Sequence, residues 1–182
     1  MTNQPSPGDL ASDPKFEWLA ESKRYLLAAD TLRTSDKYSR ARTLLRTPTL
    51  HLLAHGIELF LKANLICEEA TPKQARAFGH DIWSLWNDGR NASARRDLLA
   101  AADEFWLAAK SDPMWGDDFR SFTVVPFEVD LKRLSALHTD ETDFALRYVR
   151  PAGTEGPQPH LLCETFYRIA NRRLNEMTSP NS

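Results

Sequence analysis

One line of polar side chains interrupts the most apolar stretch of the chain, residues 50–67. The four that could do chemistry are His51, His55, Glu58 and Lys62. At about 100° per residue they lie within about 60° of one another, so they share one narrow face of a helix. A helix that is apolar on its other faces is packed inside a bundle. The stripe is therefore either a line of contact with water or a buried polar site.

Two chemical interpretations fit this stripe. His51, His55 and Glu58 could surround a metal ion, because imidazole and carboxylate are zinc ligands. The spacing is not specific, and the glutamate of an HExxH zinc motif is missing between the histidines, so we expect no metal. Glu58 and Lys62 are instead expected to form an ion pair four residues apart. A buried pair needs further partners, and a buried, fully partnered pair would indicate a functional site.

The segment Gly79-His80-Asp81 has a structural and a chemical interpretation. Gly79 can close one helix, and His80 or Asp81 can cap the next one. Capping does not require a histidine, however. His80 near other charges could act as an acid–base group or contact a phosphate. We favour capping and packing over chemistry here.

The late segment Arg147-Tyr148 is the third candidate site. Loop arginines beside an aromatic ring can bind phosphate and stack on a base. In the alternative interpretation, Tyr148 anchors the loop while the arginines stay solvated. The connection that holds Arg147 is long, and long loops are often functional.

Helical spacing of apolar residues, capping residues and prolines predict the elements that must position these groups. We expect two long loops, at 112–126 and 140–159, and no convincing sheet. The fold is predicted to be an all-α antiparallel helical bundle with extra short helices. Helices are expected at 15–34, from the Thr47-Pro48 start to about Glu69, at 72–79, 80–86, 93–110, 127–138 and 159–177.

The composition is that of an ordinary globular protein, with 182 residues, 42% hydrophobic and 26% charged residues and a net charge of −2. We predict a disordered leader at 1–12, one helical-bundle domain at 13–177 and a disordered tail at 178–182. No basic field attracts nucleic acid at long range. Cys67 and Cys163 are expected to be reduced core residues. There is no secretory signal, and charges within 50–67 argue against a membrane span, so a cytoplasmic location is expected.

Two groups of residues resemble the bacterial HEPN-like (higher eukaryotes and prokaryotes nucleotide-binding) family. The first is AHGIELFLKA at 54–63, followed by Gly79-His80-Asp81-Ile82 and Leu85, and the second is Leu146-Arg147-Tyr148. The resemblance implies an antiparallel bundle of four to five helices, usually dimeric. Members of this family include metal-independent RNases, toxins paired with nucleotidyltransferase antitoxins, and non-catalytic nucleotide or RNA binders.

The RNases of that family carry an Arg-x4–6-His motif near the start of a late helix. This chain departs from the pattern, because Arg46-x4-His51 and Arg133-x4-His138 have the spacing but neither opens the final helix. No catalytic residue can therefore be transferred by motif. The common signatures of nucleotide-binding folds and hydrolases, GxxxxGK[ST], GxGxxG and GxSxG, are also absent from the sequence.

Three hypotheses of function remain. The first is a HEPN-like module of bacterial defence or regulation that binds a nucleotide, RNA or a partner protein without a cofactor. The second is a metal-independent endoribonuclease, with His80, His51 and Arg147 as candidate catalytic residues. The third is a structural dimeric subunit, with some of its five tryptophans at an interface. A homodimer and a nucleotidyltransferase-type antitoxin are the expected protein partners. In the first hypothesis the ligand-binding residues are Glu58, Lys62, His80, Asp81, Arg147 and Tyr148.

Overall fold

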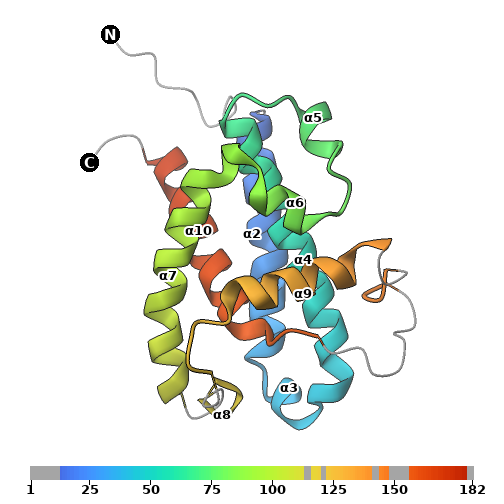
Figure 1. The fold of residues 1–182 in the computed structure, drawn as a ribbon, viewed down its shortest axis with the longest axis vertical. Coiled ribbons are helices and arrows are strands. Elements are labelled where there is room, and N and C mark those ends of the chain that lie inside the picture. The colour runs from blue at the N-terminus through green and yellow to red at the C-terminus, as the bar shows by residue number, and fades with distance from the viewer. Residues whose placement is uncertain (1–12, 113–115, 120–121, 141–143, 148–155, 180–182) are drawn as a thin grey trace.

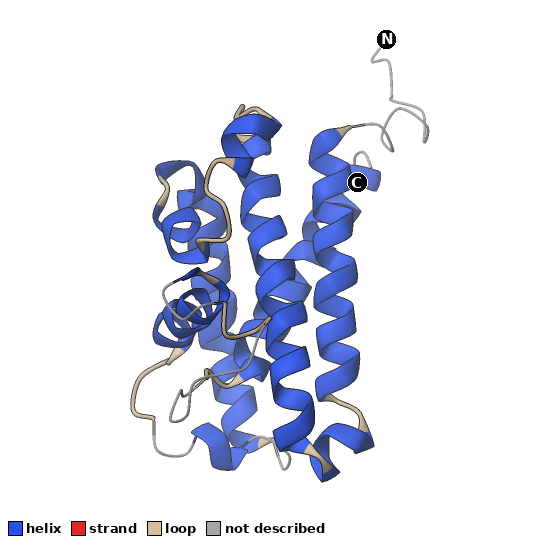
Figure 2. Ribbon diagram, turned by 90° about the vertical axis from the view of Figure 1, so that its right-hand side faces the viewer, coloured by secondary structure: helices blue, strands red, loops and turns tan. Residues whose placement is uncertain are grey.

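The computed structural model of the chain describes residues 13–112, 116–119, 122–140, 144–147 and 156–179. Every regular element in these described ranges is helical, and none is a strand (Figures 1 and 2). The predicted all-α helical bundle is confirmed. The predicted leader at 1–12 and residues 180–182 of the predicted tail lie outside the described residues.

Four long helices form the frame, and shorter ones connect them. Local capping signals place some of their ends: the side chain of Asp13 caps the first long helix, and Thr71 and Gln74 form a reciprocal capping box at a short one. In chain order the described elements are α2 (Pro14–Arg33), α3 (Asp36–Arg40), α4 (Arg42–Cys67), α5 (Pro72–Arg76), α6 (Ile82–Asn87), η1 (Gly89–Asn91), α7 (Ala92–Ser111), α8 (Gly116–Phe119), α9 (Phe127–His138) and α10 (Pro159–Thr178).

The predicted start of the central helix at Thr47-Pro48 is wrong, because α4 begins at Arg42 and runs through Pro48. Proline inside a helix removes one backbone hydrogen bond. Interactions outside the helix hold this first part in place. Arg46 donates to the carbonyl oxygens of Gly156 (2.5 Å) and Pro157 (3.2 Å), just before α10. Tertiary contacts therefore extend the helix past a residue that usually starts one.

Helix α4 lies inside the bundle, and α2 runs alongside it over much of its length (Figures 1 and 2). Gly56 makes this close approach possible. A Cβ at Gly56 would lie 2.9 Å from Leu26 Cγ and 3.1 Å from the Leu26 backbone nitrogen. The Ser22 hydroxyl also donates to the Gly56 carbonyl at 2.8 Å. The two helices thus pack backbone against backbone at this point.

Helix α9 crosses the front of the bundle in Figure 1, and its C-terminal end comes up to α4. The Ser135 hydroxyl accepts from the Trp83 backbone N–H at 2.9 Å and so ties α9 to α6. At the other end of α9, Phe127 stacks on Phe166 of α10 with ring centroids 5.8 Å apart. These contacts fix where the last residue of α9, His138, meets α4.

By length and composition, α4 is apolar enough to cross a membrane, but 72% of its apolar stretch is buried inside the molecule. A core helix of a bundle has the same character.

Cys163 lies in the core as predicted, whereas Cys67 is exposed at the end of α4, and both thiols are free. Of the five tryptophans, Trp86 is fully buried in the chain and is not available to an interface.

Candidate functional site

The polar stripe of α4 points into a cluster centred on the Glu58 carboxylate, which is only 3% exposed. Lys62, 5% exposed, donates to Glu58 Oε1 at 2.6 Å. Its ammonium group also donates to the carbonyl oxygen of Gly79, again at 2.6 Å. The predicted Glu58–Lys62 ion pair therefore exists, and it is buried with further partners. This is the arrangement that we associated with a functional site.

Two histidines share the other oxygen of Glu58. His138 Nε2 lies 2.9 Å and His80 Nδ1 lies 3.0 Å from Oε2. A carboxylate can only accept, so each of these nitrogens carries its proton toward Glu58. In the neutral form of the ring, His80 then has an unprotonated Nε2, and its side chain is 37% exposed. His138 is fully buried, and its Nδ1 has no hydrogen-bond partner among the described residues.

Arg147 covers His80 from the solvent side. Its Nη2 lies 3.1 Å from Nε2 and 3.3 Å from Nδ1 of the His80 ring, and the arginine itself is exposed. Its guanidinium also lies over the Phe144 ring, 5.3 Å from the centroid. Phe144 has a positive φ of 52°, which is uncommon for a residue with a side chain. The turn that holds Arg147 is secured to α9 by the Leu146 N–H, which donates to the Leu137 carbonyl at 3.2 Å.

The remaining histidines of the stripe line the edge of this cluster. His55 Nδ1 lies 3.9 Å from Glu58 Oε2, too far for a hydrogen bond, and its ring packs edge-on against Tyr25 with centroids 4.4 Å apart. The His51 ring lies 6.2 Å from that of His138. Burial is the main cause that lowers the pKa of both His51 and His55, so both favour the neutral form.

Glu58 stays ionised in this setting. Burial on its own would raise the pKa of the Glu58 carboxyl, since it disfavours the charged form. The hydrogen bonds from His138, Lys62 and His80 outweigh burial and hold that pKa well below its ordinary range. A carboxylate that keeps its charge can orient the rings that donate to it.

A glycine shapes the link between α5 and the cluster. Gly79 has a φ of +58°, a backbone conformation that residues with side chains rarely adopt. Its carbonyl oxygen accepts a hydrogen bond from the Lys62 ammonium group. Asp81 then caps α6, because its side chain accepts from the Ser84 N–H at 2.9 Å. These two residues place His80 between them, facing Glu58.

The candidate catalytic residue His51 lies at the edge of the cluster, and the residues predicted to bind a ligand divide into three groups. Glu58, Lys62, His80 and Arg147 come together, as the polar-site interpretation requires. The carboxylate of Asp81 serves as the α6 N-cap and bonds Ser84, so the capping interpretation holds for this residue. Tyr148 lies outside the described residues.

His138 is the cluster residue that sequence reasoning did not select. A signal existed, because His138 follows Phe127, Leu131 and Leu134 at helical spacing and so continues their buried face. The spacing Arg133-x4-His138 contains this residue, but it gave no reason to place His138 beside Glu58. Arg133 pairs with Asp130 at 3.6 Å, and Arg46 binds backbone carbonyls near α10.

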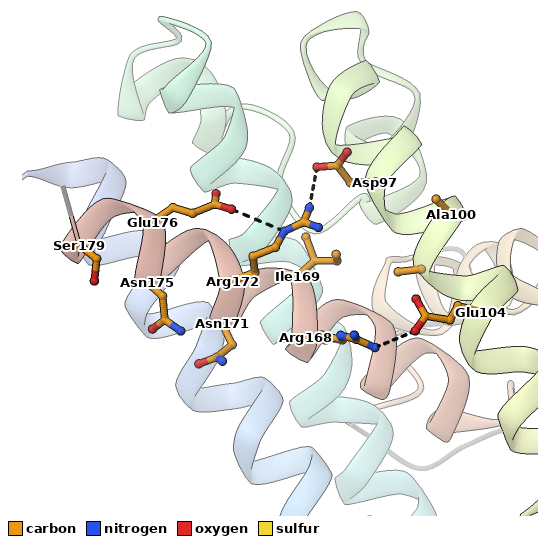
Figure 3. A pocket seen from close by; sticks show the side chains of 11 residues that line it. Asp97, Ala100, Glu104, Arg168, Ile169, Asn171, Arg172, Asn175, Glu176 and Ser179 are labelled. Atoms are coloured by element: carbon orange, nitrogen blue, oxygen red, sulfur yellow. Dashed lines mark hydrogen bonds and ion pairs between the residues drawn. The ribbon is translucent and has the colours of Figure 1, made fainter. Parts of the chain in front are cut away.

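A separate groove of about 700 Å³ lies between α7 and α10 (Figure 3). Two of its arginines pair across it with carboxylates of α7: Arg168 Nη1 lies 3.4 Å from Glu104, and Arg172 Nη2 lies 3.0 Å from Asp97. These charges neutralise one another at an exposed surface. The Glu58 cluster, by contrast, combines burial, an oriented histidine and an exposed arginine, and it is the stronger candidate.

Comparison with known proteins adds no relative. No protein-family model matches the chain, and no curated protein or solved structure is significantly similar to it. The geometry of the cluster therefore carries the functional argument.

Proposed function

We propose that the chain is a HEPN-like helical module that binds a phosphate group of a nucleotide or RNA at the Glu58 cluster. The observation that carries the proposal is the pair formed by Arg147 and His80, which is reachable from solvent and backed by buried Glu58. Arginine presents several N–H donors to phosphate oxygens, and a bound phosphate gains from charge-assisted hydrogen bonds.

The charge balance of the cluster supports an anionic ligand. Glu58 supplies one negative charge, while Lys62 and Arg147 supply two positive ones, so an excess of one positive charge remains with neutral histidines. Lys62 is committed to Glu58 and Gly79 in the interior. Arg147 lies exposed, and its described polar contact is the His80 ring rather than a carboxylate. The unmatched charge is therefore on the accessible residue.

Calorimetric titration with mononucleotides and short single-stranded RNA, in buffer containing EDTA, tests this proposal. A charge-assisted hydrogen bond contributes about 1.5–3 kcal/mol, so Arg147→Ala should weaken binding roughly ten- to 150-fold. Arg24→Ala is the matched control, because Arg24 is also exposed but pairs with Glu21 on α2, away from the cluster. Failure of the wild-type protein to bind any of these ligands would refute the proposal.

A second function, metal-independent RNA cleavage, is favoured by the Glu58–His80–Arg147 arrangement. The carboxylate fixes the His80 ring through Nδ1, so that Nε2 can serve as the general base once Arg147, which lies 3.1 Å from Nε2, turns from it to the phosphate. Nε2 would accept the proton of a ribose 2′-hydroxyl as its oxygen attacks the adjacent phosphorus. The P–O5′ bond then breaks, the leaving 5′-oxygen takes a proton from water, and Arg147 stabilises the charge on the nonbridging phosphate oxygens. His80→Ala should then abolish cleavage of RNA in EDTA. RNA that stays intact with the wild-type protein would leave only the binding function.

The protein partners implied by the family resemblance form part of this proposal. A homodimer is expected, and light scattering of the purified chain tests it. Co-expression with a nucleotidyltransferase encoded beside it, followed by affinity capture, tests the antitoxin partner. A monodisperse monomer that captures no such protein would count against both.

A further inference from the structure

Two histidines and the carboxylate of the cluster form a second constellation, and the phosphate proposal uses only the carboxylate of the three. His55, Glu58 and His138 each offer one possible ligand atom, and these three atoms all lie within 4.8 Å of one another. We propose that these three side chains bind a divalent transition-metal ion such as Zn²⁺. The set differs from the one considered in the sequence, His51, His55 and Glu58, because His138 of α9 takes the place of His51.

The distances between these atoms suit a small metal ion. Ligands held about 2.0–2.1 Å from a tetrahedral Zn²⁺ lie roughly 3.3 Å apart. Glu58 Oε2 lies 2.9 Å from His138 Nε2 and 3.9 Å from His55 Nδ1, one shorter and one longer than this spacing. Movements of about half an ångström, together with transfer of the His138 ring proton from Nε2 to Nδ1, would therefore convert the present contacts into coordination bonds.

The helices hold the ligands in place before any ion arrives. His55 and Glu58 lie one turn apart on α4. His138 is the last residue of α9, and its ring is fully buried. The edge-on contact with Tyr25 fixes the His55 ring. Preorganised ligands on rigid helices favour metal binding, because little flexibility is lost when the ion enters.

Lys62 determines how the carboxylate can bind. Its ammonium group occupies Glu58 Oε1 at 2.6 Å, so only Oε2 is available to an ion. A single carboxylate oxygen and two imidazole nitrogens leave at least one coordination position open, as in catalytic rather than structural metal sites. His80 borders that position, since its Nδ1 lies 3.0 Å from the same oxygen.

The proposal goes beyond the phosphate-binding function, because it needs neither Arg147 nor an anionic ligand. The two can therefore fail separately. Nucleotide and RNA binding is measured in EDTA, whereas the metal experiment uses chelator-treated protein with no nucleotide present. Arg147→Ala should weaken the first and leave metal binding in place.

The test is titration of the chelator-treated full chain with Co²⁺, followed by its displacement with Zn²⁺. Co²⁺ in a site with two histidines and a carboxylate should give visible absorption bands that Zn²⁺ removes. His55→Gln should weaken Co²⁺ binding about tenfold or more, because it removes one of three ligands. His51→Gln is the matched control: His51 lies one turn before His55 on the same stripe, is outside the ligand set and should leave affinity unchanged.

A second variant protects the test against misfolding. His138→Gln should also lose the Co²⁺ bands, and circular dichroism shows whether its helices remain. Zn²⁺ should raise the melting temperature of the wild-type and His51→Gln proteins but not of the His55→Gln protein. The absence of Co²⁺ bands in the wild-type protein, or bands unchanged in folded His55→Gln protein, would overturn the proposal.

Discussion

Substitution of Glu58 by glutamine gives the sharpest test of how the cluster is held together. The 2.6 Å separation between Lys62 Nζ and Glu58 Oε1 corresponds to about 6 kcal/mol of attraction at an effective dielectric constant of about 20. Desolvation of the two ions opposes this gain by several kcal/mol each, so the net contribution of the pair is small. Removal of one partner has a larger effect, because the other charge stays buried.

We therefore expect Glu58→Gln to lower the free energy of unfolding by about 3–5 kcal/mol. It leaves the 5% exposed Lys62 with the Gly79 carbonyl and an uncharged amide oxygen. Lys62→Met should cost less, since Glu58 still accepts from His138 and His80. The double variant should be less destabilised than the sum of the two single variants, by about 0.5–3 kcal/mol.

Urea unfolding followed by tryptophan fluorescence measures these changes. The control is Glu21→Gln, which removes the partner of Arg24 from a pair of the same 2.6 Å length whose side chains are 43% and 75% exposed. The free energy of unfolding of that variant should fall by less than about 1 kcal/mol. A loss just as small for Glu58→Gln, with additive effects in the double variant, would refute the argument that a buried charge is left without its partner.

Three further predictions concern pH and the two special glycines. Burial lowers the pKa of His160 to about 2, so the unfolded chain takes up its proton first, and the contribution of His160 to stability is lost as pH falls below about 6.5. In urea unfolding, His160→Gln should lose about 0.7 kcal/mol less than the wild type between pH 7 and 6 and about 1.2 kcal/mol less between pH 6 and 5, and parallel losses would contradict this. Gly56→Ala should destabilise by about 1–3 kcal/mol in the same assay, because its Cβ would lie 3.1 Å from the Leu26 backbone nitrogen. Gly79→Ala should cost about 1 kcal/mol for its φ of +58°, whereas Gly89→Ala, with open space and no positive φ, should be nearly neutral.

The sequence predicts those parts of the fold that short-range rules control. Asp13, Thr71 and Asp81 all cap helices as expected, because each side chain bonds a backbone N–H two or three residues away. Rules of the same range fail at Pro48. The contacts that carry α4 past this proline come from Gly156 and Pro157, more than a hundred residues later in the chain, and no local pattern contains them.

The candidate site shows the same division. Helical periodicity alone places Glu58 and Lys62 on one face, and the structure keeps them there. Their meeting with His80 and Arg147 was expected from the family resemblance, since periodicity says nothing about which helices touch. His138 was missed because a histidine that continues an apolar face is most simply interpreted as a core residue, and only the crossing of α9 over α4 brings it to Glu58.

The cluster has two layers with different roles. Glu58, Lys62 and His138 are buried and bound to one another, so they set the geometry but have little direct contact with solvent. His80 and Arg147 are accessible and take their orientation from that layer. Replacement of a buried ion pair by apolar residues is often neutral or stabilising, so packing alone does not explain why α4 carries charges here. The proposed function accounts for them, because buried charges in fixed positions would orient His80 and Arg147 toward a bound phosphate.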